Sequence, residues 1–341
     1  MEDLPIDTSH PAIRDYMALV RLQVLTPLSL LINIATMMVC TLVVNPNLGD
    51  ITKQYPATIA PSPRMIAIYI VAIYIGQIGY CVLLVVARKP ETKRTLVKGV
   101  GLPLVFSNWI MAAWCIAWLF QAFLLSTILL GILLVLLVYA NIVLLIYHAP
   151  THERPLDIAL IHAPMRAFMI LPFGVLFPYS LFVELGFTWS PGEPQHYARH
   201  QWAGFGVMLG VNLLSLFVVV LRRDIVWCIA ASWIDASIWT AKPKPFPVFV
   251  RDLTCAMSNT AHPLIRLHTQ ITVVVFTIVH PLGLVVSALW LKLRGGRREG
   301  AIALPADEEE NGDSRQPNAN GQGQGQRRFG AREVDAEAIW G

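Results

Sequence analysis

Charged residues are scarce in this chain. Only 14% of the 341 residues are Asp, Glu, Lys or Arg, against about 25% in a typical soluble domain. None at all occurs from Leu22 to Val44 or from Gly99 to Thr151. A run of about 20 apolar residues spans the hydrocarbon core of a bilayer as a helix, because lipid offers no hydrogen-bond partner to an open backbone. The sequence therefore predicts an all-α, polytopic integral membrane helical bundle with the lipid bilayer as its surroundings and no nucleic acid as partner.

Motifs of several enzyme and metal-site classes are also missing. The five cysteines form no C-x-x-C pair, which argues against a zinc site or a disulfide framework. The chain has no G-x-S-x-G elbow, no H-E-x-x-H and no phosphate-binding loop. His148 and His152 have i, i+4 spacing, but Pro150 between them argues against a helical metal-binding face. We expect no metal and no cofactor, and these absences favour a protein without catalytic activity.

The apolar runs predict about eight transmembrane helices. They lie at about 20–44, 65–88, 101–121, 122–147, 166–186, 202–222, 225–240 and 270–292. The run at 225–240 is the shortest. Its alternative is a re-entrant or tilted helix, which would move everything after it to the opposite side of the membrane.

The distribution of Lys and Arg orients this map. With eight spans, one set of loops holds about twice as many basic residues as the other, above all the loop from Arg88 to Lys98. The richer side is expected to be cytosolic. This predicts a cytosolic N-terminal segment at 1–19, a transmembrane domain at 20–292 and a basic, then polar, cytosolic tail at 293–341. The tail is poor in apolar residues and is predicted to be disordered, and its end, Phe329–Trp340, is either a partner-binding helix or part of the loose tail.

Polar residues within the spans are candidates for function, because burying them in lipid is unfavourable. Glu184 and Asp235 lie in apolar runs that end on the same predicted side, and they either line a polar cavity or reach water at the interface. His280 precedes Pro281, and a proline within a helix frees a carbonyl. The imidazole is either a proton-sensitive or ligand-contacting group or a neutral partner of that carbonyl. Glu184, Asp235 and His280 are the candidate catalytic residues.

A pattern of short motifs runs from about Ile32 to Trp239. It comprises Asn-Pro-Asn-Leu-Gly at 45–49, Lys-Gln-Tyr-Pro at 53–56, Ala60-Pro61, a Tyr-rich span, Ser-Asn-Trp at 107–109 and Ala-Ala-Ser-Trp at 230–233. The pattern resembles extended, multi-span relatives of the tryptophan-rich sensory protein family, also called the peripheral benzodiazepine receptor or translocator-protein family. The pattern also resembles that of fungal membrane proteins of unknown function with a similar layout.

The resemblance implies a pocket for porphyrins or sterol-like molecules between aromatic side chains of a five-helix bundle. One departure is clear, because the family's second span begins with a Trp-containing stretch, whereas Ala60–Tyr69 contains no Trp. The positions that match the pattern, together with the mid-membrane Gln77, form the candidate ligand-binding set. They are Tyr69, Tyr74, Gln77, Asn108, Trp109, Trp114 and Trp118. Their alternative role is ordinary helix packing or contact with lipid.

Three functional hypotheses follow. The leading one is binding or transport of a small apolar or amphipathic molecule in an intramembrane aromatic pocket. The second is an intramembrane enzyme of terpene-cyclase or isomerase type, with Glu184 and Asp235 as general acid and base, which needs no cofactor. The third is a membrane scaffold that recruits a cytosolic protein partner through its tail.

Overall fold

The computed structural model describes residues 11–148, 154–190, 200–241 and 275–292. All regular secondary structure in these ranges is helical, which confirms the all-α prediction. The chain divides into two units, 1–289 and 290–341, and the architecture below is that of the first. The tail of the scaffold hypothesis lies outside the described residues.

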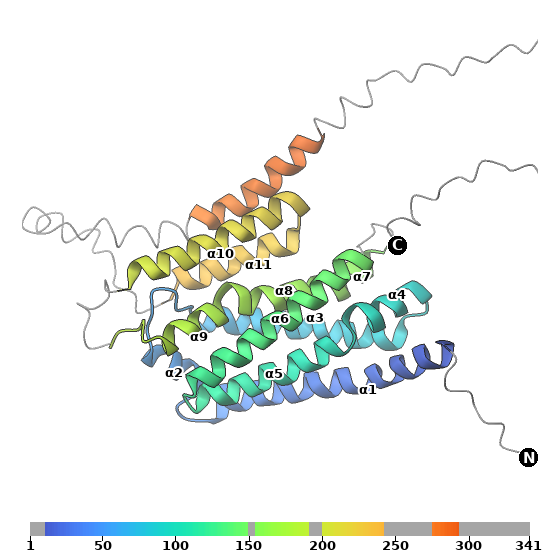
Figure 1. The fold of residues 1–341 in the computed structure, drawn as a ribbon, viewed down its shortest axis with the longest axis horizontal. Helices are drawn as coiled ribbons and strands as arrows, with labels where there is room; N and C mark the ends of the chain where they lie inside the picture. The colour runs from blue at the N-terminus through green and yellow to red at the C-terminus, as the bar shows by residue number, and fades with distance from the viewer. Residues whose placement is uncertain (1–10, 149–153, 191–199, 242–274, 293–341) are drawn as a thin grey trace, which may run out of the picture. The chain divides into compact units, whose positions relative to one another are not determined.

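The helices follow the predicted spans closely (Figure 1). In chain order they are α1 (Pro11–Met38), α2 (Leu48–Gln54), α3 (Pro63–Val86), α4 (Pro90–Arg94), α5 (Gly101–Leu119), α6 (Phe123–Tyr147), α7 (Pro155–Asp157), α8 (Ala163–Leu171), α9 (Phe177–Glu184), α10 (Gln201–Arg222) and α11 (Ile225–Trp239), followed by the helix Val275–Lys292. Four π-helical stretches continue them, namely η1 (Val39–Val43), η2 (Thr95–Val100), η3 (Ile158–His162) and η4 (Pro172–Leu176). Because η2 and η3 join short helices to long ones, the third and fifth spans begin about ten residues earlier than the apolar runs indicate.

Seven helical stretches in the described part of the chain are long and apolar enough to cross a membrane. The predicted span at 225–240 corresponds to α11, which has 15 residues. At 1.5 Å per residue it is about 22 Å long, shorter than the roughly 30 Å hydrocarbon core. The polytopic bundle is therefore confirmed, with α11 as a shorter helix.

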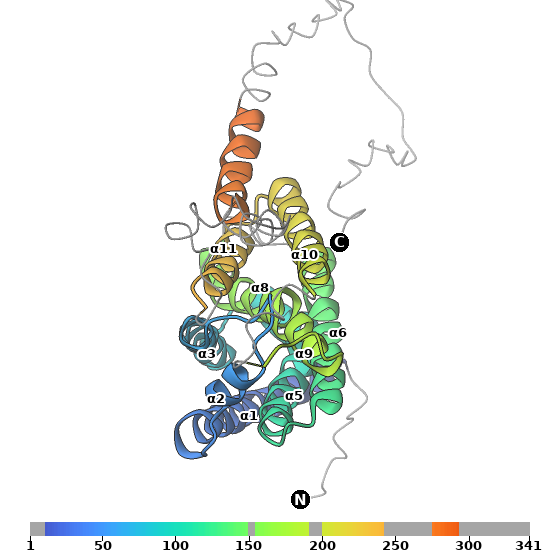
Figure 2. The ribbon, with the colours of Figure 1, turned by 90° about the vertical axis from the view of Figure 1, so that its left-hand side faces the viewer.

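Five of the long stretches form a closed core. α1 contacts α3 and α5, α5 contacts α6, α6 contacts α8 and α9, and α8 returns to α3 (Figure 2). Two glycines let α3 approach the fifth long helical stretch, Pro155–Glu184, closely. Gly76 faces Pro164 and Gly79 faces Leu160. Large apolar side chains such as Val85 and Val135 remain exposed on the outside, as expected of a surface in contact with lipid.

A second group of helices lies against this core. Trp233 of α11 donates its indole N–H to the carbonyl of Met65, 3.0 Å away, and Ser62 N–H donates to the Ser237 carbonyl at 2.8 Å. These bonds fix α11 to the start of α3. The last helix packs on α10, where Gly283 faces Leu216 and Val220.

Candidate functional site

A hydrogen-bonded chain of polar side chains crosses the centre of the five-helix core. Asn33 of α1 donates from Nδ2 to Oδ1 of Asn108 on α5, at 2.9 Å. Tyr74 of α3 donates its hydroxyl to Oδ1 of Asn33, at 3.2 Å. Both asparagines are fully buried. These hydrogen bonds join three helices that are separate in sequence, so they stabilise the bundle near its middle.

Several polar atoms in the same core are buried without a partner among the described residues. Gln77 is only 2% exposed, and neither its Nε2 nor its Oε1 has a hydrogen bond. The same holds for Asn108 Nδ2 and for the indole N–H of Trp114. Gln77 lies three residues after Tyr74, which places the two side chains on neighbouring positions of one helix face. A bound molecule could therefore bond to the amide N–H and carbonyl of Gln77, to the amide N–H of Asn108 and to the indole N–H of Trp114.

The aromatic candidates divide into two sets. Trp114 and Trp118 share a face of α5, with ring centroids 6.1 Å apart, and Trp118 continues to Phe123 and Tyr179 at 5.2 and 5.4 Å. These rings pack on one another at the end of the bundle where Tyr179 donates its hydroxyl to the Thr52 and Tyr55 carbonyls.

The remaining two candidates lie elsewhere. Tyr69 donates its hydroxyl to the Ala167 carbonyl at 2.8 Å and so bridges α3 to α8. Trp109 is 39% exposed and packs edge-on against Phe106, so its ring lies at the surface of the bundle.

A second polar cluster lies between α10, α11 and the last helix. Asp235 and His280 are almost completely buried, and Asp235 Oδ2 is 3.8 Å from His280 Nδ1. His280 Nε2 lies 3.3 Å from the Asn212 carbonyl. A carbonyl only accepts, so Nε2 carries a hydrogen, and the lone pair of a neutral Nδ1 faces the carboxylate. A buried carboxylate is costly without a positive partner, so this geometry calls for a proton between the two side chains.

Glu184 is placed apart from these residues. It is the last residue of α9, and its side chain is exposed. The structure thus brings together Asp235, His280 and Asn212 of α10, and leaves Glu184 at the surface of the bundle.

One buried ionic pair was not anticipated from the sequence. Arg166 Nη1 of α8 is 2.9 Å from Asp224 Oδ2, and both side chains are largely buried. The only sequence signal was an arginine beside an apolar run, which also fits a loop residue at a span end.

These features define a class: a polytopic helical membrane protein with a closed five-helix core that encloses unpartnered polar groups. The chain matches the model of the family described as TSPO-like protein over residues 23–262, well over half its length, and it belongs to this TSPO-like family. The match confirms the resemblance and covers α10, α11 and the five-helix core apart from the first part of α1. No curated protein and no solved structure shows a significant match.

Proposed function

We propose that this membrane protein binds a small apolar or amphipathic molecule within the five-helix core, with its polar group bonded to Gln77. The observation that carries the proposal is the Gln77 side chain, which is buried without a hydrogen bond from any described residue. Leaving such a group unbonded in an apolar interior costs about 1–3 kcal/mol. A ligand hydroxyl, carbonyl or carboxyl group would satisfy it.

The contrast with neighbouring side chains supports this role. Asn33 and Tyr74 form hydrogen bonds to side chains of other helices, as residues that hold a bundle together do. Gln77 and the Trp114 indole do not. The neighbouring rings of Trp114 and Trp118 add an apolar aromatic surface toward one end of the same bundle.

The test compares two glutamines. Gln77→Leu removes the unpartnered amide, whereas Gln23→Leu removes an amide that donates to the Leu84 carbonyl at 2.9 Å. The probes are a porphyrin and a sterol, the ligand classes implied by the family resemblance, added to the full-length protein in detergent and followed by quenching of its tryptophan fluorescence.

Gln77→Leu should weaken binding about tenfold or more, since a site built to bond a polar group discriminates strongly against its loss. It should also leave the ligand-free protein as stable or more stable. Gln23→Leu should lower the melting temperature and leave the affinity unchanged. The proposal is contradicted if wild type and Gln77→Leu bind a probe with equal affinity. It is also contradicted if neither the porphyrin nor the sterol binds.

A second candidate function rests on the Asp235–His280 pair. Two ionisable groups 3.8 Å apart in an apolar surrounding can hold and release one proton, which is the requirement of an acid–base isomerase or cyclase. In this candidate function His280, 3.8 Å from Asp235, takes the role predicted from the sequence for Glu184.

Metabolite profiles separate this candidate from simple binding. Lipid extracts of cells expressing wild type should contain a product that is missing with Asp235→Asn and with His280→Gln and present with Glu184→Gln. Identical extracts from wild type and Asp235→Asn contradict an enzyme that depends on this pair, while retained probe binding by Asp235→Asn supports the proposal for the five-helix core.

A further inference from the structure

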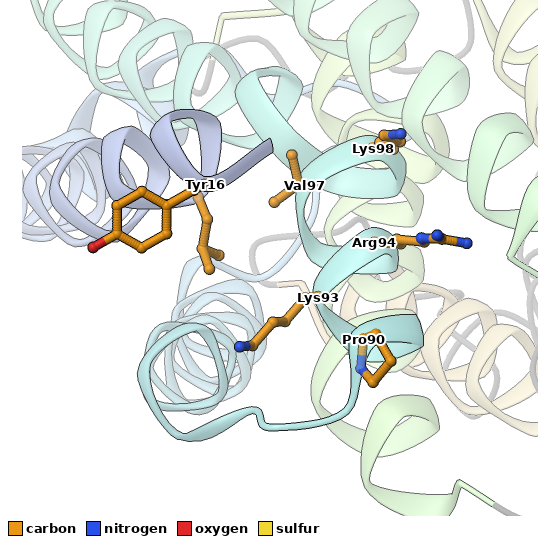
Figure 3. A pocket seen from close by; sticks show the side chains of 7 residues that line it. Tyr16, Pro90, Lys93, Arg94, Val97 and Lys98 are labelled. Carbon is orange, nitrogen blue, oxygen red and sulfur yellow. The ribbon is translucent and has the colours of Figure 1, made fainter. Parts of the chain in front are cut away.

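An open groove lies at the end of the bundle where basic residues are concentrated. It encloses about 260 Å³ between the first turns of α1 and the segment α4–η2. Tyr16 and Leu19 form one wall, and the other is formed by Pro90, Lys93, Arg94, Val97 and Lys98 (Figure 3). This site lies apart from the polar core of the proposed function, because its walls are the ends of the helices rather than their middles.

The groove has an apolar floor and a polar rim. Figure 3 shows that Lys93 and Val97 extend toward α1, while Arg94 extends to the opposite side of its helix. Along this wall Lys93 follows Pro90 by three residues and Val97 follows Lys93 by four, the spacings that make side chains neighbours on a helix surface. The site therefore combines the amine of Lys93 and the phenol of Tyr16 with the side chains of Leu19 and Val97.

The depth of the groove matches the headgroup region of a bilayer. Tyr16 is the first residue of the apolar stretch Tyr16–Val43, and Pro90 is the first of Pro90–Leu119. Tyrosine and lysine are the side chains expected where a span meets the interface. The adjoining sequence, 11–21 and 87–98, holds seven basic and two acidic residues, and such clusters beside a span attract anionic lipid.

We infer that this groove binds one anionic phospholipid. Its phosphate bonds to Lys93 and Tyr16, and the start of an acyl chain lies along Leu19 and Val97. Two features favour an anionic phospholipid as the occupant. The charge of the groove is complementary to a phosphate, and an amine lies beside an apolar floor at headgroup depth. A soluble phosphate would use only the rim, and a neutral lipid only the floor.

The experiment is native mass spectrometry of the full-length protein released from detergent, with phosphatidylserine or phosphatidylcholine titrated in. Wild type should retain phosphatidylserine in preference to phosphatidylcholine. Lys93→Gln should lower the phosphatidylserine affinity about fivefold, the effect of one basic residue at a membrane surface. Lys89→Gln is the matched control, because it removes the same charge from an exposed residue next to Pro90 that does not line the groove, and it should change the affinity less than twofold.

Two further arms complete the test. Val97→Trp fills the floor without changing the charge and should lower the affinity for both lipids, and melting temperatures show whether each variant is folded. Inorganic phosphate and glycerophosphoserine should not displace the lipid. Equal losses in Lys93→Gln and Lys89→Gln, an unaffected Val97→Trp, or displacement by inorganic phosphate would each overturn the inference.

Discussion

Arg166 and Asp224 connect the five-helix core to the start of α11 through a buried ion pair. Their ion pair connects α8 to the residue before α11, and Asp224 also accepts a hydrogen bond from the Trp227 N–H at 3.1 Å. A side chain that accepts from the third residue of a helix caps its free N–H groups. Asp224 therefore holds both the position of α11 and its first turn.

Asp224→Asn should lower the free energy of unfolding by about 3 kcal/mol, since it keeps a capping side chain and leaves the buried Arg166 charge without its partner. Asp224→Ala should lose about 1 kcal/mol more, because it removes the cap as well. Unfolding by a denaturing detergent measures both. Asp50→Asn is the control, because the Asp50–Lys53 pair is exposed and such pairs contribute less than about 1 kcal/mol. Equal effects at the two sites would contradict the assignment.

His148, the residue just after α6, is expected to make the stability of the protein depend on pH. Thr95 donates its hydroxyl to the Glu91 carbonyl, so its oxygen accepts from the ring N–H of His148, 3.3 Å away. Burial, and then the charge of Lys98, hold the pKa of His148 below its ordinary value of 6.5. The unfolded chain then binds the proton more readily than the folded protein.

The stability contributed by neutral His148 should therefore be present above pH 6.5 and be lost as pH falls toward the lower pKa of the folded state. Melting temperatures in detergent at pH 8 and pH 5 measure the decrease. His148→Gln keeps a hydrogen-bond donor without a titrating group, and it should show a smaller decrease over this interval. A decrease of the same size in both proteins would assign the effect to other groups.

At the scale of elements, close contact between α3 and the fifth stretch depends on small residues. A Cβ at Gly76 would lie 2.7 Å from Pro164 Cγ, a distance that forces the helices to shift. Proline is rigid, so the contact cannot be relieved by a change of rotamer. The five-helix core therefore needs a glycine here for a steric reason.

Gly76→Ala should lower stability by about 1–3 kcal/mol, as overpacking of a core does. Gly210→Ala is the matched control in α10, where an added Cβ would meet no atom within 4 Å, and it should be neutral or stabilising by up to about 1 kcal/mol. Thermal unfolding in detergent distinguishes the two. If both variants melt at the wild-type temperature, α3 does not approach the fifth stretch this closely.

At the scale of the whole molecule, the short helix α11 decides the side on which the chain ends. If α11 crosses with the seven longer stretches, we predict both termini on the side richer in basic residues, which is the side expected to be cytosolic. If it does not, the last helix reverses direction. The basic residues around Arg222 and after Lys292 favour the first arrangement.

Single glycosylation acceptors test this topology, because the chain has no Asn-x-Ser/Thr site of its own. An acceptor placed between Phe187 and His200 should be modified in a eukaryotic host, and one placed in the tail after Lys292 should not. The readout is a mass shift that a deglycosylating enzyme removes. Modification of the tail would show that α11 does not cross.

The sequence by itself determined the class, the approximate spans and the family. Charge-free runs require helices in lipid whatever their neighbours are, and the matching motifs needed no coordinates to be recognised. Gln77, Asn108 and His280 were also found this way, because a polar residue in an apolar run is visible in one dimension.

Only the tertiary structure decided which of these residues meet. Asn33 and Asn108 are 75 positions apart, and only the packing of α1 on α5 brings them together. Packing also turned Trp109 outward, placed His280 rather than Glu184 beside Asp235, and left Gln77 without a hydrogen-bond partner among the described residues. The physical reason is that hydropathy reports how deep a residue lies in the membrane, whereas the rotation of each helix about its axis is set by contacts with its neighbours.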